Sequence, residues 1–281
     1  MTGETQELTR VILGSNGLIG RAINHKFQND NCHPLPRIVY QDWWDESQIP
    51  EIRRVLANLT PSSGYLQIYV ASGVLSPKED PGLIKKVNEL VPINIARALD
   101  GTNFQLETFG TIHETFEMHN EYIDSKRRLS VWLSENVQED DYLHLRLHTL
   151  YDDSKPKDFM FLGSLYRCVS EGIALKMSSG KQLREFHHVD DDVEAISFLE
   201  QKGYMGIVNL NHGNVISLFE LAEGITKCFK DSGEIEAGFY PDPLSENYDV
   251  FFDLVSHENT LNFREATSSL VDIFKKLILV E

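Results

Sequence analysis

The sequence predicts an α/β protein with a doubly wound parallel sheet, and three observations support this fold class. Short apolar runs of strand character alternate with longer amphipathic stretches from Arg10 to about Leu147. A glycine-rich turn directly follows the first apolar run. After about Tyr151 the alternation gives way to a loop rich in Lys and Asp and to short mixed elements. Strands that alternate with helices are typical of a parallel sheet covered by helices on both faces.

Each element is predicted from apolar periodicity and from its boundary residues. Strands are expected at Arg10–Leu13, Ile38–Tyr40, Leu66–Ala71, Phe104–Phe109 and Tyr142–Leu147. Helices are expected from the glycine turn to about Gln28, from Asp45 or Ser47 to Leu59, and at Leu83–Leu99, Tyr122–Glu135 and Ser217–Phe229. Asp45, Ser47 and Ser217 are of the residue types that cap a helix N-terminus.

Composition and charge limit the class of partner. The 281 residues fit one large α/β domain or a domain with an integrated lobe. The net charge of −17 is spread along the chain, which argues against nucleic acid or an anionic membrane as partner. A phosphorylated small substrate remains compatible, because one local basic site can hold it.

Sequence features also limit the compartment. No apolar run approaches the ~18 residues of a membrane-spanning helix, and Met1–Glu7 is polar and acidic, unlike a signal peptide. Cys32, Cys168 and Cys228 lie far apart without a CxxC motif, so neither a disulfide framework nor a structural zinc site is expected. We therefore expect a cytoplasmic protein.

The glycine-rich turn has the pattern Gly14-x-x-Gly17-x-x-Gly20, at the end of a strand and the start of a helix. Glycines allow a tight turn and let the backbone approach a pyrophosphate, while the helix N-terminus supplies amide donors. The turn therefore predicts a Rossmann-type dinucleotide site, although the spacing alone is also compatible with a structural turn.

Tyr122 and Lys126 lie four residues apart in an expected helix and so share one face. An ammonium next to a phenol favours the phenolate and makes the Tyr useful as a general acid or base. Isolated Tyr-x-x-x-Lys pairs are common on solvated helix faces. The glycine turn upstream is what favours a functional interpretation of this pair.

Three further stretches carry a resemblance to a known family. They are Val87–Leu90 with Asn88, Leu145–Tyr151 after the Tyr122 helix, and Gly180–Asp191, which reads Gly-Lys-Gln-Leu-Arg-Glu-Phe-His-His-Val-Asp-Asp. The last is similar to a Gly-x-Gln-x-Arg-Asp-Phe-Ile-His-Val-Asp-Asp motif. With these stretches the chain resembles, over nearly its whole length, extended short-chain dehydrogenase/reductases of the NAD-dependent epimerase/dehydratase type.

The resemblance implies roles for particular residues. Tyr122 would exchange a proton with the reacting oxygen, Lys126 would hold the nicotinamide ribose, and a hydroxyl at the end of the preceding strand would orient the same oxygen. Phe109 stands at the usual hydroxyl position, so Thr108 is the expected hydroxyl and Thr111 the alternative. The expected cofactor-binding residues are Gly14, Asn16, Gly17, Leu18, Ile19, Gly20, Asp42, Ala71 and Lys126, and the expected substrate-binding residues are Asn88, Thr149 and Arg184.

The choice between NAD and NADP stays open at this point. Asp42 could end the second strand and bind the adenosine ribose of NAD. In a second alignment the second strand lies within Pro34–Val39, Asp42 lines the adenine pocket, and Arg21 and Arg37 could meet a 2′-phosphate. Trp43 and Trp44 are interpreted as packing residues, His187 and His188 as strand-end residues without a metal, and Asp45 as a helix cap.

The residues after Thr108 narrow the reaction. Family dehydratases have an acidic pair there, because eliminating water needs an extra acid and base, and Phe109-Gly110 cannot provide it. His113 and Glu114 are interpreted as solvated loop residues, and Cys168 as a buried helix residue rather than an epimerising one. Simple hydride transfer remains, and the short link from strand to Tyr122 looks most like CDP-4-keto-dideoxy-sugar reductases such as CDP-abequose synthase.

The sequence thus predicts an NAD(P)-dependent reductase of a nucleotide-diphosphate sugar, with NADPH favoured. The alternatives are a 4-epimerase and a non-catalytic cofactor-binding protein. Residues 1–150 are expected to form the Rossmann domain and 151–281 mainly a substrate-binding lobe, with about 187–199 returning to the first domain. A homodimer is expected from the family.

Overall fold

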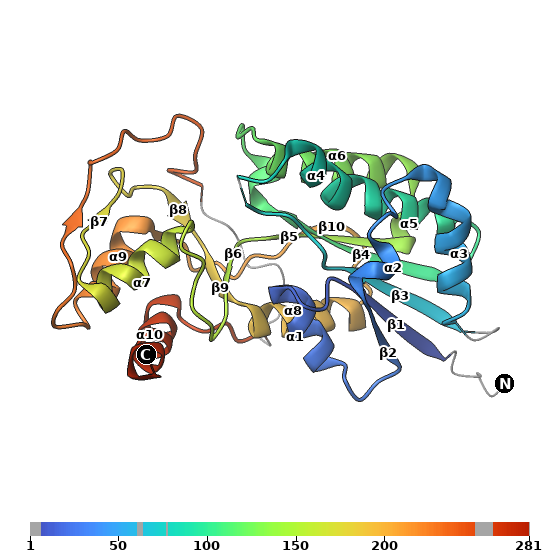
Figure 1. Ribbon diagram of the computed structural model, residues 1–281, viewed down its shortest axis with the longest axis horizontal. Helices are drawn as coiled ribbons and strands as arrows, with labels where there is room; N and C mark the ends of the chain where they lie inside the picture. Colours follow the sequence, from blue (N-terminus) through green and yellow to red (C-terminus); the bar gives the residue numbers. More distant parts are fainter. Residues whose placement is uncertain (1–6, 61–63, 77, 251–260, 281) are drawn as a thin grey trace. The chain divides into compact units, whose positions relative to one another are not determined.

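A computed structural model of the chain describes residues 7–60, 64–76, 78–250 and 261–280 (Figure 1). The expectation that no signal peptide precedes the domain concerns residues that, apart from Glu7, lie outside this range. The chain divides into two compact units. One contains Met1–Leu147 and Ala195–Asn209, and the other contains His148–Glu194 and Leu210–Glu281.

The first unit is built on a six-stranded sheet in the order β10-β5-β4-β3-β1-β2, with all neighbouring strands parallel. The strands are β1 (Leu8–Leu13), β2 (Cys32–Leu35), β3 (Tyr65–Val70), β4 (Phe104–Thr111), β5 (Tyr142–Leu147) and β10 (Gly206–Asn209). In this order β2 lies on one side of β1, and β3, β4 and β5 follow on the other side. The strand order therefore reverses at β1. Open α/β sheets bind ligands beyond the strand ends at such a switch point. The doubly wound α/β fold is as predicted.

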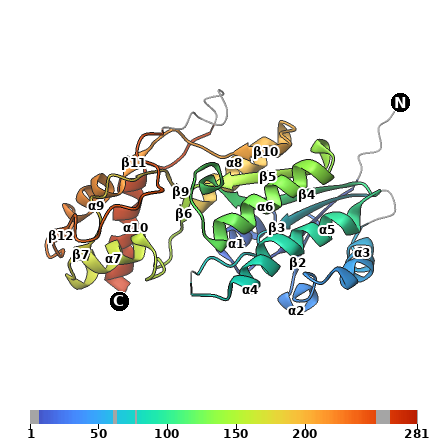
Figure 2. The ribbon, with the colours of Figure 1, turned by 90° about the horizontal axis from the view of Figure 1, so that it is seen from above.

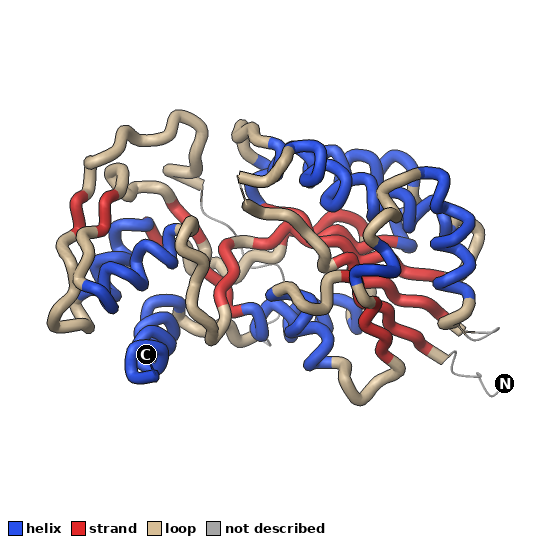
Figure 3. The backbone as a smooth tube through the Cα atoms, viewed as in Figure 1, coloured by secondary structure: helices blue, strands red, loops and turns tan. Residues whose placement is uncertain are grey.

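Helices cover both faces of this sheet (Figures 1 and 3). One face carries α3 (Ile49–Ala57), α4 (Pro81–Lys85), a π-helical segment (Lys86–Leu90), α5 (Val91–Leu99) and α6 (Glu121–Asn136). The other carries α1 (Leu18–Lys26) and the C-terminal part of α8 (Val189–Gln201). In Figure 2, α4, α5 and α6 lie side by side over the strands. Their apolar faces bury Leu13, Ile68 and Leu106 of the sheet against Ile95 and Leu129, which holds the helix of Tyr122 firmly on the sheet.

One predicted strand is wrong. Ile38–Tyr40 belongs to α2 (Arg37–Tyr40), and the second strand ends earlier, at Leu35. Pro36 directly precedes α2 with φ −67°, an angle that suits the start of a helix. Ile38 is 71% exposed, so its β-branched side chain does not pack on a sheet. Asp42 therefore does not end the second strand.

The remaining elements follow the predicted pattern. The other four expected strands are present, and the helix predicted at Leu83–Leu99 spans α4, the π-helical segment and α5. The Asp45 carboxylate accepts the Ser47 N–H at the start of the short turn η1 (Glu46–Gln48). Ser217 caps α9 (Leu218–Thr226) in a reciprocal capping box with Glu220.

The second unit is helical with short strand pairs. Three helices, α7 (Phe161–Glu171), α9 and α10 (Ala266–Val280), enclose a core that includes Tyr166, Leu221 and Phe274. The pairs are β6 (Thr149–Tyr151) with β9 (Phe186–His188), β8 (Leu183–Arg184) with β11 (Ile216–Ser217), and β7 (Leu175–Lys176) with β12 (Ile235–Glu236). Cys168 is buried in α7, as expected. Within the described ranges, no helix has the length and apolarity needed to cross a membrane.

Two carboxyl groups lie together on the α8 face of the sheet, one fully buried and one half-buried. Glu107 of β4 is fully buried and accepts a hydrogen bond from Gln67, while Glu200 of α8 accepts one from the Tyr69 hydroxyl at 3.0 Å. Burial, and then the neighbouring Glu200 charge, raise the pKa of Glu107 well above its usual range. Burial likewise raises the pKa of Glu200. In the unfolded chain these carboxyl groups ionise at a lower pH than in the folded chain. Their contribution to folding stability is therefore present at acid pH and is lost as the pH rises above about 4.5.

We therefore expect Glu200→Gln to reduce the loss of stability between about pH 5 and pH 8. The amide keeps an acceptor for Tyr69 but cannot ionise. The check is the thermal midpoint across this pH range, for the wild type, for this variant and for Glu135→Gln, which removes an exposed carboxylate from α6. Parallel stability profiles for the wild type and Glu200→Gln would contradict the expectation.

Candidate active site

The glycine turn closes directly on the loop after β3. Gly14 has φ +84°, and a Cβ there would lie 2.4 Å from the backbone nitrogen of Ser72. A Cβ on Gly20 would lie 2.1 Å from the Gly14 carbonyl oxygen. Neither contact is possible for a residue with a side chain, so the two glycines let α1 begin against the carboxyl ends of β1 and β3.

A cavity of about 410 Å³ lies beside this turn. It is lined by Gly14, Ser15, Asn16, Gly17, Leu35, Arg37, Tyr40, Gln41, Trp44, Ala71, Ser72, Gly73, Val74, Leu83, Lys86, Val87 and Val91. Among the described residues, the lining carries two cations, Arg37 and Lys86, and no carboxylate. A pocket with this charge at a helix N-terminus suits a ligand with phosphate groups.

The predicted cofactor residues other than Lys126, which is not one of the lining residues, fall into three groups. Gly14, Asn16, Gly17 and Ala71 line the cavity. Leu18, Ile19 and Gly20 form the first turn of α1 beside it. Asp42 is exposed in the turn after α2 and is not one of the lining residues, and neither is Arg21, whose side chain donates to the Asn16 carbonyl.

Two aromatic residues of the cavity were not expected there. The Tyr40 hydroxyl accepts the Gly14 N–H at 3.1 Å, which ties α2 to the glycine turn. Trp44 is half-buried, with the Lys86 ammonium 3.7 Å above its ring, a cation–π contact. Trp43 is fully buried and packs in the core, as predicted, but Trp44 has one face on the cavity.

Asn88 supports the loop that follows β3. Its carboxamide accepts the Val74 N–H at 2.8 Å and donates to the Val74 carbonyl at 3.0 Å. The side chain is 1% exposed. Both hydrogen-bonding groups of Asn88 thus hold the cavity wall at Val74, and the expected contact of Asn88 with substrate stays a prediction.

Tyr122 and Lys126 lie in the first two turns of α6, with Asn120 capping the helix through the Ile123 N–H. Lys126 is 6% exposed, and its Nζ is 4.0 Å from where a Cβ on Gly73 would lie. Across the described residues, neither the Tyr122 hydroxyl nor the Lys126 ammonium makes a hydrogen bond. A buried ammonium without a partner, next to a cavity wall, is free to bind a ligand.

The protonation states of the pair follow from burial and from one nearby carboxylate. Burial, and then the Glu114 charge, raise the pKa of Tyr122 to about 12. Burial lowers the pKa of Lys126 to about 8, against the opposite effect of Glu114. At neutral pH the pair is therefore a protonated phenol with an ammonium.

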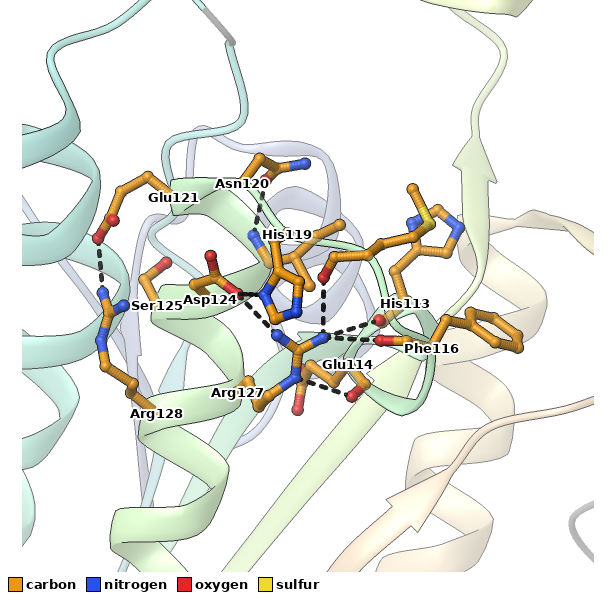
Figure 4. Close-up of polar contacts among 12 residues, drawn as sticks. His113, Glu114, Phe116, His119, Asn120, Glu121, Asp124, Ser125, Arg127 and Arg128 are labelled. Carbon is orange, nitrogen blue, oxygen red and sulfur yellow. Dashed lines mark hydrogen bonds and ion pairs between the residues drawn. The ribbon is translucent and has the colours of Figure 1, made fainter. Parts of the chain in front are cut away.

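The segment between β4 and Tyr122 is held by Arg127 of α6 (Figure 4). Its guanidinium donates to the carbonyl oxygens of Glu114, Phe116 and Met118 at 3.0 Å each, and to that of His113 at 3.4 Å. It also pairs with Asp124 at 2.7 Å. One planar fork satisfies several backbone acceptors at once, which gives the short connection a defined path into α6.

The two candidate hydroxyls differ in their contacts. Thr108 is 1% exposed, and its hydroxyl lies 2.7 Å from Nδ1 of His144 in β5. Thr111 ends β4 and caps the short turn η3 (Ile112–Thr115), where its side-chain oxygen accepts the His113 N–H. Phe109 is buried, as its apolar side chain requires. The hydroxyl proton of Thr108 is therefore engaged with an imidazole, and that of Thr111 is not.

Glu114 is the residue that sequence reasoning misjudged most. It was expected in a solvated loop, yet its side chain has 0% exposure. It accepts the Thr111 N–H at 2.8 Å and Nε of Arg146 at 3.0 Å, and lies 3.3 Å from Nε2 of His144. The Thr-x-x-Glu pattern of Thr111 and Glu114 is a capping box, and this signal could have identified the position from sequence.

Thr149 and Arg184 belong to the second unit. Thr149 begins β6 and donates its N–H to the Glu185 carbonyl at 3.2 Å. Arg184 is 9% exposed, and its guanidinium pairs with Glu246 while also donating to the Leu183 carbonyl. Its charge is therefore balanced within the unit.

A second buried polar cluster surrounds Glu185. His187 lies 3.0 Å from the Glu185 carboxylate and 2.6 Å from Asp192, and its ring stacks with those of His148 and His212 at 5.0 and 4.2 Å. Burial would lower the pKa of His187, but the two carboxylates raise it to about 9. One ligand atom each of His148, Glu185 and His187 lie within 4.8 Å of one another. Because both ring nitrogens of His187 already face carboxylates, we interpret the cluster as a buried imidazolium between two carboxylates.

Comparisons with known proteins agree with this geometry. The family described as NAD dependent epimerase/dehydratase matches residues 10–210. The chain is 29% identical over 131 residues to an ADP-L-glycero-D-manno-heptose-6-epimerase of Brachyspira hyodysenteriae. That match covers 44% of this chain and 41% of the epimerase, so it spans less than half of that relative.

Solved structures share the fold at low identity. RMD from Pseudomonas aeruginosa, solved with NADPH, has a TM-score of 0.74 at 17% identity, covering 97% of this chain and all of that one. A UDP-N-acetylglucosamine 4-epimerase from Methanobrevibacter ruminantium has a TM-score of 0.74 at 14% identity, with 99% and 100% coverage. A dTDP-4-dehydrorhamnose reductase from Bacillus anthracis, solved with NADP, has a TM-score of 0.71 at 17% identity, with 98% and 100% coverage.

Replacing Arg127 should weaken the fold around this site. We expect Arg127→Met to lower the free energy of unfolding by about 2 kcal/mol, because several part-buried carbonyl groups lose a charged donor. Arg127→Lys should recover only part of this, since an ammonium cannot span the same acceptors. Urea unfolding measures both.

The matched control for this experiment is Arg54→Met, which breaks an exposed pair with Glu51 on α3. Exposed pairs contribute little. A loss of unfolding free energy in Arg127→Met as small as that of the control would contradict the role given to Arg127.

Proposed function

The chain belongs to the NAD-dependent epimerase/dehydratase family, and we propose that it reduces a 4-keto-deoxy sugar carried on a nucleoside diphosphate. Its cofactor is NAD or NADP. The observation that carries the proposal is the pair on α6. Tyr122 carries a protonated phenol, and four residues further along the helix the unpartnered Lys126 ammonium lies 4.0 Å from where a Cβ on Gly73 of the cavity lining would be.

The residues around the cavity fit a dinucleotide. The glycine turn exposes amide groups at the N-terminus of α1, where a pyrophosphate is favoured. Lys126 is a buried cation lacking a partner in the described chain, as a ribose-binding ammonium would be before its ligand arrives. When bound, the reduced nicotinamide supplies the hydride.

The protonation state of Tyr122 favours reduction. With its pKa raised to about 12 by burial and by Glu114, the phenol carries its proton at neutral pH. It can therefore donate a proton to the oxygen that becomes an alkoxide when a ketone is reduced. A reductase needs the phenol in this form when the ketone binds, whereas a 4-epimerase uses both the phenolate and the phenol in its cycle.

The hydroxyl partner and the substrate contacts are part of the proposal. We propose Thr111 for the orienting hydroxyl in place of the predicted Thr108, because the Thr108 proton is already engaged by His144. Arg184 and Thr149 of the second unit remain our candidates for the substrate's diphosphate and sugar. The nucleotide is left open among CDP, dTDP, UDP and GDP, and CDP is the choice that the sequence favoured.

Two further expectations belong with this function. We propose that the enzyme works as a homodimer, as the resemblance implied, and in the cytoplasm, as the sequence features led us to expect. Gel filtration with light scattering on the full chain tests the dimer.

Tyr122→Phe should remove the proton donor without closing the cavity. We expect kcat to fall by about 10²–10⁴-fold, the usual contribution of general acid catalysis, while the Kd for NADPH changes little. The assay follows loss of nicotinamide absorbance with 4-keto-6-deoxy sugars on the four nucleotides. Tyr204→Phe, an exposed residue, is the matched control.

Two results would count against this function. One is a folded wild-type protein that binds NADPH but oxidises it with none of the four substrates. The other is a Tyr122→Phe variant with the wild-type rate.

Arg37 should distinguish NADPH from NADH. It follows the end of β2 by two residues and lines the cavity, where the adenosine ribose binds in this fold. We expect Arg37→Gln to raise the Kd for NADPH about tenfold or more, because a charged hydrogen bond to the 2′-phosphate is lost. The Kd for NADH, which has no 2′-phosphate, should not change.

Arg21→Gln provides the control for Arg37. Both residues were candidates for the 2′-phosphate, but Arg21 does not line the cavity. If Arg21→Gln alone weakens NADPH binding selectively, the assignment to Arg37 is wrong.

A further inference from the structure

Two positively charged side chains, those of Arg37 and Lys86, line the cavity beside the glycine turn. Within the part of the chain that the structure describes, neither forms an ion pair, and no carboxylate belongs to the lining. Lys86 is half-buried rather than fully extended into solvent. Two cations that face one cavity without a protein partner favour a ligand that carries negative charge.

The Trp44 ring holds the Lys86 side chain in place. The ammonium lies 3.7 Å from the centroid of the indole ring, and both residues line the cavity. A cation–π contact orients a flexible lysine but, unlike a contact with a carboxylate, does not neutralise its charge. Lys86 therefore presents a fixed positive charge to a ligand.

The backbone that carries Lys86 is fixed to the wall of the same cavity. Lys86 begins the π-helical segment, in which Val87 also lines the cavity. Asn88 of this segment bonds both backbone groups of Val74, at 2.8 and 3.0 Å. π-Helical turns are rare overall and concentrate at functional sites. The segment thus gives Lys86 a set position relative to the loop after β3.

Lys86 and Arg37 belong to the same side of the cavity. Arg37 begins α2, and Trp44, which holds Lys86, lies in the turn that follows this helix. In this fold the segment after the second strand binds the adenosine ribose, whereas the pyrophosphate lies at the glycine turn. The two cations are therefore suited to a group on the ribose rather than to the pyrophosphate.

We propose that Lys86 is the second cation of a site for the 2′-phosphate of NADP, with Arg37 as the first. A phosphate monoester carries about −1.5 to −2 charges near neutral pH, which two cations balance and one does not. NAD instead offers ribose hydroxyls, which an acidic residue binds in this fold, and the described lining has no such residue. Lys86 is thus a specificity-determining residue, and Trp44 is a positioning residue that acts through it. The inference rests on the proposed function only in taking this cavity as the dinucleotide site.

The test is calorimetric titration of the full chain with NADPH, with NADH and with two fragments. The fragments are adenosine 2′,5′-bisphosphate and adenosine 5′-monophosphate, which differ only in the 2′-phosphate. We expect Lys86→Met to raise the Kd for NADPH and for the bisphosphate about tenfold, because a charged hydrogen bond is lost. The Kd values for NADH and the monophosphate should not change. Lys86→Arg keeps the charge and should retain most of the affinity.

Lys85→Met is the matched control. Lys85 directly precedes Lys86, is exposed at the end of α4 and is not one of the lining residues. The control removes the same charge from the same stretch of helix, so it measures the general electrostatic effect on binding. We expect the Kd for NADPH to stay close to that of the wild type, because exposed charges are screened by salt.

Trp44→Leu tests the positioning role of the ring. Loss of the cation–π contact should raise the Kd for NADPH about threefold relative to that for NADH. If Trp44 acts through Lys86, the same substitution in a Lys86→Met protein should cause no further change in this ratio. A further change in the double variant would overturn the role given to Trp44.

The outcomes separate this inference from the proposed function. Equal effects of Lys86→Met and Lys85→Met on NADPH binding overturn the inference, and so does an equal loss of NADPH and NADH affinity in Lys86→Met. A protein that reduces keto sugars with NADPH while Lys86→Met keeps the wild-type Kd leaves the function standing without the inference. A protein in which Lys86→Met weakens NADPH selectively, but which reduces none of the sugars, leaves the inference standing without the function.

Discussion

The candidate site depends on one constraint, the convergence of the carboxyl ends of parallel strands at one edge of the sheet. β1 delivers the glycine turn, β3 the loop at Gly73, and β4 the turn that leads to Tyr122. The strands are about 4.8 Å apart, so these three segments must lie within reach of one dinucleotide. Because the segments after β1 and β3 converge, Gly14 lies so close to Ser72 that no side chain fits between them.

Buried charge is the second theme of the molecule, and each case is balanced differently. Lys126 keeps its proton at neutral pH because an arginine-bound carboxylate lies nearby. His187 keeps its proton because two carboxylates flank it. The cation near Glu107 and Glu200 is Arg10, which is itself paired with Asp30. Burial outweighs it, and the result is a pair of carboxyl groups that resists ionisation. An isolated charge in a protein interior costs too much free energy to persist. A buried group therefore either has a neighbour of opposite charge or takes its neutral form.

The fold was readable from sequence wherever local signals and tertiary packing agree. The strand–turn–helix at Gly14–Gly20 and the helix of Tyr122 have strong apolar periodicity and clear boundaries. The strand predicted at Ile38–Tyr40 was wrong. β-Branched residues predict a strand only if the chain can pair with a neighbouring strand there, and after Pro36 the chain starts a helix instead. The prediction that Glu114 lies in a solvated loop was wrong for another reason. Its burial is due to His144 and Arg146, which lie 30 and 32 residues away along the chain, and only its capping box is local.

The end of β4 departs from the family pattern, and the departure has a physical interpretation. Where family members have a small hydroxyl, this chain has Phe109, and the following Gly110 leaves space that the Glu114 carboxylate and His144 occupy. A hydroxyl donates directly to the reacting oxygen, whereas a buried carboxylate acts through the field it imposes on its neighbours. That field raises the pKa of Tyr122 and supports the charge of Lys126. Both effects favour the protonated pair at neutral pH. The departure at the end of β4 is therefore accompanied by a buried carboxylate whose charge acts on both residues of the pair.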